Sequence, residues 1–281
     1  MAMRFPTGNR YGRRGGLKLW PLLLFGLFFA YYYFSNQQTV PLTGRTQLVD
    51  MSREQEAALG LQAYQQILSQ SQVLREGEAV DLVKRIGMRL AKAAASEDPG
   101  FEWEYNVVAD EQANAFALPG GKVAVYTGLL PIAANEDGLA VVMGHEIAHA
   151  IARHGAERMA HQTLVQLGSM AASIALSDMD YNTQQMVMGA LGVGAQYGVL
   201  LPFSREHESE ADYMGLIYVA RACFDPSEAP RLWSRMAKAG GAAPVEFMST
   251  HPSSETRIKQ FETWMPEALE LRARHCQTPG Q

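Results

Sequence analysis

Two histidines and a glutamate within residues 145–149 have the types and the spacing of a zinc hydrolase. His145 and His149 are four positions apart, so on a helix they share a face and can direct two imidazoles at one ion. Glu146 lies about 100° around the helix, outside that coordination sphere but within reach of a water held there. Zinc lowers the pKa of such a water, and the glutamate can accept its proton. The stretch predicts two zinc ligands and Glu146 as general base.

The surroundings of this motif favour a metal over two histidines satisfied within a protein core. Residues 139–152 are apolar nearly all round, which is typical of a buried helix. Two imidazoles and a carboxylate buried there without partners would cost free energy, and a metal ion supplies the partner. We therefore expect one Zn²⁺ per chain.

A catalytic zinc needs a third protein ligand, which the same helix does not supply. In the metzincin pattern H-E-x-x-H-x-x-G-x-x-H, the last glycine and histidine would stand where this chain has Ala152 and Gly155. His154 follows His149 by five positions, about 140° around the helix, so it is a poor ligand. The third ligand must come from another segment.

The best source is the acidic stretch "SREHESEAD", residues 204–212, which offers two carboxylate pairs at helical spacing. Glu208 and Asp212 share a stripe with small and apolar residues, as close helix packing requires, whereas Glu206 and Glu210 look more solvent-facing. An aspartate one turn after a ligand can accept the free N–H of a ligating histidine. We assign Glu208 as the third ligand and Asp212 as its supporting residue. Glu206, His207 and Glu210 are expected on a solvated charged face.

These segments together resemble the HtpX and CAAX-prenyl-protease family of zinc metallopeptidases, peptidase family M48. The resemblance rests on "GHEIAHAIARH", "SREHESEAD", "NAFALPGGKVAVYTGLL" and "STHPSSETRI", in that order, and covers about residues 51–272. It implies a gluzincin fold with His145, His149 and Glu208 on zinc. The BepA-like periplasmic branch is the most similar, although this chain has no tetratricopeptide tail.

The resemblance also implies further site residues. Asn114, Ala115, Phe116 and Ala117 correspond to an edge strand that can pair with an extended peptide substrate, although they would equally suit a core hairpin. His251 is a catalytic candidate that could polarise the oxyanion or occupy the open metal position. Arg257 could orient that loop or the substrate. The competing interpretation of residues 251 and 257 is a helix N-cap region with a surface ion pair.

The function implied by the resemblance is metalloendopeptidase activity on misfolded or misassembled envelope proteins. Polypeptides are the expected substrates, with chaperones or outer-membrane assembly machinery as partners. The alternative is a metal-binding assembly factor that holds extended segments without cleaving them. A complete set of ligands and a base argues against this alternative, because a binding protein has no use for the base.

The secondary-structure elements that position these residues predict an α+β fold, mostly helical with a small sheet. The resemblance implies that this is a zincin (gluzincin) metallopeptidase domain. Periodicity predicts helices over about 52–68, 77–96, 135–153, 156–177, 183–200, 205–222, 226–238 and 253–272. Ser52 and Gln55 have capping-box spacing at the first of these. Residues 101–110 read as a strand, and 114–130 as a hairpin around Pro-Gly-Gly. We expect the metallopeptidase domain over residues 51–275, after a polar linker at 35–50.

The N-terminus favours membrane attachment. Residues 1–18 carry five basic side chains and no acid, and residues 19–34 are sixteen uncharged, mostly apolar positions. We interpret 19–34 as a single transmembrane anchor, with a cleaved signal peptide as the alternative. The basic tail would remain in the cytoplasm and place the remaining chain in the periplasm, at a bacterial inner membrane. The net charge of −5 and the lack of a basic stripe argue against nucleic-acid binding.

Two features stay open on sequence alone. Residues 164–203 are apolar and could be a lid, a membrane-dipping hairpin or core helices; polar breaks favour core helices with a lid. Cys223 and Cys276 could form one disulfide tying the C-terminal tail to a helix, or remain two thiols.

Overall fold

The computed structural model describes residues 16–196, 200–239, 246–251 and 255–276. The chain divides into two compact units, one of residues 1–36 with 161–202 and the other of residues 37–160 with 203–281. Every residue predicted for the metal site belongs to the second unit. Residues 1–15 of the predicted basic tail lie outside the described part of the chain.

The first unit is helical. It contains α1 (Trp20–Ser35), most of α6 (His154–Ala175) and α7 (Tyr181–Ala195). Among the described residues, none of the helices combines the length and the apolar character needed to cross a membrane. None of the residues of α7 is buried, so α7 is not a core helix, and its role as a lid or as a membrane-dipping hairpin stays a prediction.

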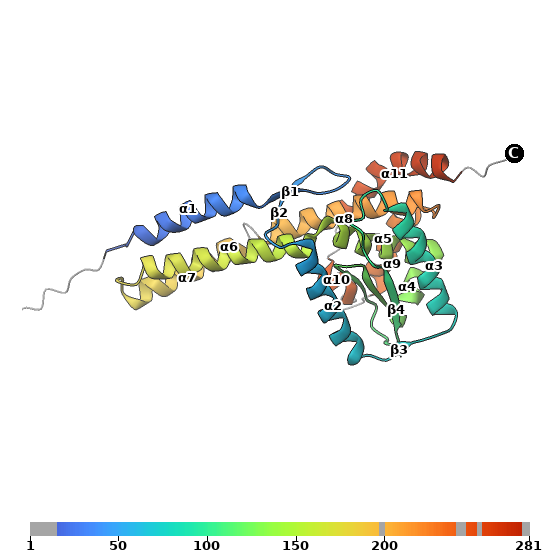
Figure 1. The fold of residues 1–281 in the computed structure, drawn as a ribbon, viewed down its shortest axis with the longest axis horizontal. Coiled ribbons are helices and arrows are strands. Elements are labelled where there is room, and N and C mark those ends of the chain that lie inside the picture. Colours follow the sequence, from blue (N-terminus) through green and yellow to red (C-terminus); the bar gives the residue numbers. More distant parts are fainter. Residues whose placement is uncertain (1–15, 197–199, 240–245, 252–254, 277–281) are drawn as a thin grey trace, which may run out of the picture. The chain divides into compact units, whose positions relative to one another are not determined.

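The second unit combines a four-stranded sheet with helices (Figure 1). Its helices are α2 (Arg53–Ser69), α3 (Glu78–Ala93), α4 (Leu130–Ala133), α5 (Glu136–Ala152), α8 (Leu201–Arg221), α9 (Glu228–Ala239), α10 (Glu246–Thr250) and α11 (Glu255–His275). The predicted capping box is confirmed: Ser52 accepts from the Gln55 amide, and the Gln55 side chain accepts from the Ser52 amide. The predicted mostly helical fold with a small sheet is confirmed.

The sheet has the strand order β3 (Val73–Leu74), β4 (Glu104–Val108), β6 (Lys122–Tyr126) and β5 (Ala115–Leu118). The predicted hairpin pairs β5 with β6 antiparallel, while β4 and β6 run parallel. Because side chains alternate along a strand, Val123 and Val125 join the main core, and Ala124 packs with Tyr64 of α2 on the other face. β5 is left at an edge of the sheet.

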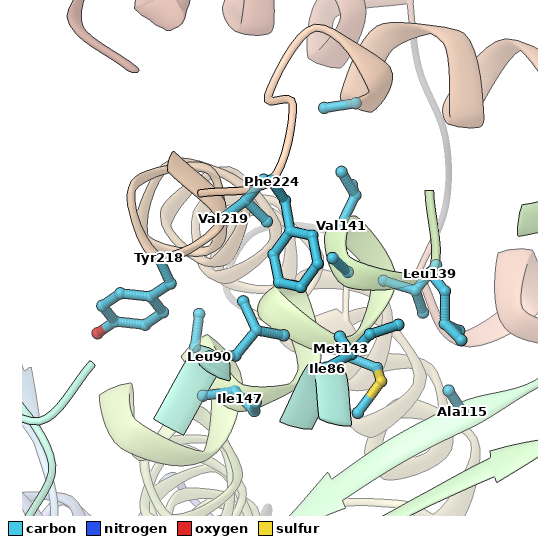
Figure 2. Packing of buried hydrophobic residues seen from close by; sticks show 14 of the residues in the cluster. Ile86, Leu90, Ala115, Leu139, Val141, Met143, Ile147, Tyr218, Val219 and Phe224 are labelled. Atoms are coloured by element: carbon cyan, nitrogen blue, oxygen red, sulfur yellow. The ribbon is translucent and has the colours of Figure 1, made fainter. Parts of the chain in front are cut away.

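The main core surrounds α5. Figure 2 shows Met143 and Ile147 of α5 beside Ile86 and Leu90 of α3, with Phe224 nearby. All five side chains are at most 2% exposed. A helix buried on nearly every side cannot move without disturbing the core, so the residues that it carries are held rigidly.

Helices α5 and α8 approach each other at two glycines. A Cβ built on Gly215 would lie 2.9 Å from the backbone carbon of Gly144 and 2.9 Å from the amide nitrogen of His145. No side chain fits such a gap without backbone movement. The small-residue stripe that the sequence indicated on α8 therefore brings its carboxylates against the histidines of α5.

Two further segments bear on the sequence predictions. The polar linker expected at residues 35–50 contains the paired strands β1 (Gln37–Thr39) and β2 (Thr46–Leu48). Val40, Leu48 and Val49 are buried, so hydrophobic burial holds this hairpin against the rest of the second unit. Cys223 and Cys276 form a disulfide, which was one of the two alternatives.

Candidate metal centre

Helix α5 presents His145 and His149 together. Asn135 caps the helix by accepting a hydrogen bond from the Gly138 amide, and Arg153 ends it in the left-handed conformation. The Nε2 atoms of His145 and His149 lie 3.1 Å apart. The i, i+4 spacing thus brings two ring nitrogens to one point, as predicted.

Glu208 reaches the same point from α8. Its carboxylate oxygens lie 3.4 Å from Nε2 of His145 and 3.5 Å from Nε2 of His149. Glu208 is buried at the cluster, whereas Glu206 is exposed, and the assignment of Glu208 as a ligand stays a prediction.

His251 follows α10 and completes the cluster. Its Nδ1 atom lies 3.2 Å from Nε2 of His145 and 3.0 Å from Oε1 of Glu208. The four candidate ligand atoms of His145, His149, Glu208 and His251 all lie within 4.8 Å of one another. The sequence left two roles open for His251, and its side chain lies at the cluster rather than on the surface.

The spacing of these atoms fits a zinc ion. Bonds of 2.0–2.1 Å in a regular tetrahedron place neighbouring ligand atoms about 3.3 Å apart. The separations of 3.1, 3.2, 3.4 and 3.5 Å lie around that value. Imidazole nitrogen and carboxylate oxygen are ligands that zinc accepts. The His-His-Glu-His cluster is therefore suited to hold one metal ion.

Asp212 and Arg257 support the cluster from behind. Asp212 Oδ1 lies 3.0 Å from Nδ1 of His145, the ring nitrogen that faces away from Glu208. Arg257 donates hydrogen bonds of 2.6 and 2.7 Å to Asp212, and its guanidinium carbon lies 3.7 Å from the ring centroid of Trp233. It also lies 3.1 Å from Glu208. Arg257 is 4% exposed, so the surface ion pair considered as the alternative is wrong.

Burial and neighbouring charge shift the pKa values of the cluster in opposite directions. Burial opposes the charged form of His145, but the carboxylates of Asp212 and Glu208 raise its pKa to about 9. Burial also opposes ionisation of Glu208, yet the surrounding histidines hold its pKa far below the usual range. The pKa of His149 is lowered by burial and by the other histidines. Their surroundings therefore favour the ionised form of Glu208 and the neutral form of His149.

Glu146 lies beside the cluster, with Oε1 of its carboxylate 3.4 Å from Nε2 of His251. It is 4% exposed, and burial raises its pKa above the usual value, against the opposing charges of His251 and His145. Oε1 has no hydrogen-bond partner in the described part of the chain. The carboxylate accepts a hydrogen bond from the backbone of Ala117. A buried carboxylate with a raised pKa and an oxygen that makes no hydrogen bond suits proton transfer.

The predicted substrate segment lies at the sheet edge next to Glu146. Asn114 precedes β5 and its side chain accepts from the Ala115 amide. Ala115 is buried in the core, and Phe116 packs against Tyr64. The backbone of Ala117 lies close enough to Glu146 to lower the pKa of its carboxyl group, so the strand borders the base.

The structure overturns the expectation of a solvated face on α8. His207 and Glu210, expected on a solvated face, are 3% and 8% exposed. Glu210 accepts from His154 at 3.0 Å, and His207 lies 2.8 Å from Glu157. Arg45 of the β1–β2 hairpin bridges both carboxylates and thereby covers this face. The basic residue comes from a segment more than 100 positions away, and no local pattern predicted it.

Burial and hydrogen bonding set the charges of this second network. Although burial opposes ionisation, hydrogen bonds from His207 and Arg45 lower the pKa of Glu157 to about 2. Hydrogen bonds from His154, Arg45 and Thr43 likewise lower the pKa of Glu210 to about 2, although burial opposes its ionisation. Burial lowers the pKa of His154 to about 4, so its ring is neutral at pH 7.

Comparison with known proteins identifies the family. Residues 80–265 match the family model described as Peptidase family M48, and this stretch contains the whole cluster. The chain belongs to peptidase family M48. Its relatives include the mitochondrial metalloendopeptidase OMA1 of Schizosaccharomyces pombe, 39% identical over 242 residues, which cover 84% of this chain and 69% of that protein. The OMA1 of Saccharomyces cerevisiae is 35% identical over 274 residues, covering 89% and 74%.

Bacterial M48 relatives match a smaller share of this chain and of their own length. The putative beta-barrel assembly-enhancing protease of Vibrio cholerae is 32% identical over 202 residues, which cover 70% of this chain and 41% of that protein. The BepA-like branch expected from the motifs is therefore not confirmed, because the OMA1 proteins match at higher identity and over more of their length. The family, the named activity of these relatives and the ligand cluster together make this M48 chain a zinc metalloendopeptidase.

Proposed function

We propose that this M48 enzyme is a gluzincin in which His145, His149 and Glu208 bind zinc and Glu146 is the general base. The observation that carries the proposal is the convergence of ligand atoms from α5 and α8 at tetrahedral spacing. Glu146, on the same helix as the two histidines, has a buried oxygen that makes no hydrogen bond within the described part of the chain.

The positions of these residues determine the role of each in the reaction. Zinc, when bound, supplies Lewis-acid polarisation and lowers the pKa of a water molecule. Glu146 accepts the proton of the attacking water on Oε1 and delivers it to the leaving amine, a transfer favoured by its raised pKa. The carboxylate of Asp212, 3.0 Å from Nδ1 of His145, favours a proton on that nitrogen, which leaves the Nε2 lone pair directed at the metal.

His251 occupies the fourth position of the cluster in the resting enzyme. Its Nδ1 atom is as close to Glu208 and His145 as a ligand would be, which supports the second of the two roles expected for it. Its other ring nitrogen lies 3.4 Å from Oε1 of Glu146. Arg257 donates to the carbonyl of His251 at 3.4 Å and so orients this loop. Movement of His251 would open the position to substrate.

The substrate is an extended polypeptide that adds to the edge of the sheet at β5. An edge strand offers backbone groups that read little sequence, which suits an enzyme acting on unfolded segments. Asn114, Ala115, Phe116 and Ala117 form this binding strand. The bond from Ala117 to Glu146 would place the scissile peptide beside the base.

In the cell, we assign the enzyme to proteolytic quality control at a membrane. The basic residues before positions 19–34 support a single-pass anchor with the catalytic domain in the periplasm of a bacterial envelope. Misfolded or misassembled envelope proteins are the proposed substrates, with chaperones or outer-membrane assembly machinery as partners. Relatives named beta-barrel assembly-enhancing proteases support this assignment.

The test is cleavage of casein and of a β-barrel precursor by the Glu146→Gln variant. Loss of the general base should reduce kcat/KM by at least about 10²-fold while zinc content stays at one per chain. A zinc-loaded variant that cleaves as fast as wild type would overturn the mechanism. Complete rescue of a deletion strain by the same variant would favour a holding function without cleavage.

A further inference from the structure

The second ring nitrogen of His149 lies against another histidine. Nε2 of His149 faces the cluster, whereas its Nδ1 lies 2.7 Å from Nδ1 of His154. The two rings are nearly perpendicular, at 77°. Two imidazole nitrogens at this distance form a hydrogen bond only if one carries a proton and the other does not.

The proposed metal site decides which nitrogen is the donor. If Nε2 of His149 directs its lone pair at zinc, a neutral His149 carries its proton on Nδ1 and donates it to His154. His154 then accepts on Nδ1 and holds its own proton on Nε2. That nitrogen lies 3.0 Å from Oε2 of Glu210, which accepts. Acceptance by the carboxylate of Glu210 is thus consistent with one tautomer of His154 and one of His149.

Glu210 is itself held by the β1–β2 hairpin. Nε of Arg45 donates to Oε2 of Glu210 at 2.8 Å, and the hydroxyl of Thr43 donates to Oε1. The same guanidinium donates to Glu157 at 3.0 and 2.7 Å. Arg45 is therefore shared between two buried carboxylates, and Glu210 cannot turn away from His154 without losing several charge-assisted bonds.

The two proposed histidine ligands have different supports. His145 lies directly against a carboxylate, that of Asp212. His149 reaches its carboxylate through a second imidazole, with His154 and Glu210 both less than a tenth exposed. Partners of this kind fix the ring orientation and raise the basicity of a ligating histidine. The β1–β2 hairpin, whose Thr43 and Arg45 hold Glu210, lies before residues 80–265, the part of the chain matched by the family model.

We propose that His154 and Glu210, held by Thr43 and Arg45, are positioning residues that fix the tautomer and orientation of His149 for metal binding. The proposal rests on the ligand role proposed above for His149. It gives the β1–β2 hairpin a part in zinc binding, although the hairpin contributes no ligand.

The test compares two substitutions of His154 in the full-length zinc enzyme. His154→Leu preserves volume but removes the acceptor, so zinc affinity, measured by competition with a chelator, should fall by about 10–100-fold. His154→Asn loses volume but keeps an oxygen near the position of Nδ1, so it should recover most of that affinity. A packing role predicts the reverse order. The visible spectrum of the cobalt-substituted enzyme should change in His154→Leu and remain close to wild type in His154→Asn.

The matched control is His207, which stacks on His154 with ring centroids 4.3 Å apart and is equally buried. His207→Asn should lower stability without changing zinc affinity or the cobalt spectrum. Should His154→Leu fail to fold, Glu210→Gln provides the same test and should weaken zinc binding about tenfold. Unchanged affinity and spectrum in a folded His154→Leu or Glu210→Gln protein would overturn the inference.

The ligand assignment is checked separately with His149→Ala. Loss of zinc from His149→Ala, together with unchanged binding in His154→Leu, would overturn only the positioning role. Retention of zinc at full affinity in His149→Ala would overturn the proposed ligand set itself, and the positioning role with it.

Discussion

The carboxylate of Asp212 lies 3.0 Å from Nδ1 of His145. The same carboxylate accepts two hydrogen bonds from Arg257, which in turn lies 3.1 Å from Glu208. One residue therefore connects a proposed ligand of α5 with a cation from α11 and, through that cation, with the proposed ligand of α8. The support of the metal site is shared between three helices.

Replacing Asp212 should damage metal binding and stability together. We expect Asp212→Ala to weaken zinc binding by about 10–100-fold, because the ring of His145 loses its acceptor. Arg257 would be left buried without its main partner, at a cost of about 3–5 kcal/mol in the free energy of unfolding. Chelator competition and urea unfolding measure the two effects. Glu206→Gln, an exposed change on the same helix, is the control, and unchanged zinc affinity in a folded Asp212→Ala protein would contradict the prediction.

The ligand assignment on α8 can be tested by metal content. Glu208→Gln should lose zinc during purification, because an amide is a poorer zinc ligand than the carboxylate that lies 3.4 and 3.5 Å from the two histidines. Glu206→Gln should keep one zinc per chain. Elemental analysis of the two purified proteins decides between them. Zinc loss in neither variant, or only in Glu206→Gln, would show that the ligand is another residue.

The contact between α5 and α8 predicts an effect of a single methyl group. Gly215→Ala would place its Cβ 2.9 Å from the backbone of Gly144 and His145. We expect the helices to separate, with a loss of about 1–3 kcal/mol in stability and weaker zinc binding as Glu208 moves away. Thermal unfolding and zinc titration measure this. Gly189→Ala in α7 is the matched control: its Cβ meets nothing within 4 Å, so zinc binding should be unchanged.

The network under the metal site predicts a pH dependence of stability. The pKa of Glu157 is about 2 in the folded protein against 4.5 ordinarily, so folding favours its ionised form. Its contribution is complete above about pH 4.5 and disappears as the pH falls towards 2. The difference corresponds to a stabilisation on the order of 3 kcal/mol.

Comparison of wild type with Glu157→Gln measures that contribution. With a chelator present in both samples, the difference in unfolding free energy should be constant from pH 7 to about 5. It should narrow as the pH is lowered further. A difference that widens on acidification would mean that Glu157 is not the group responsible.

Local patterns in the chain were sufficient for most of the helices and for the core of the metal site. The 3.6-residue period located α3, α5 and α9 to within a few residues, and the spacing of His145 and His149 required no tertiary information. Glu208 could also be chosen over Glu206, because the small residues one turn further along α8 indicated which face packs closely. These inferences depend on neighbours in the same helix, and helical geometry relates such neighbours directly.

Other features depend on contacts between distant segments, which helical or strand periodicity does not report. The parallel pairing of β4 with β6 and the position of His251 at the metal cluster belong to this class. The face of α8 with His207 and Glu210 looked solvated because its residues are polar. It is buried because Arg45, 165 positions before Glu210, neutralises it. Charge along one helix shows which residues need partners, but only the packed chain determines whether those partners are water or another buried side chain.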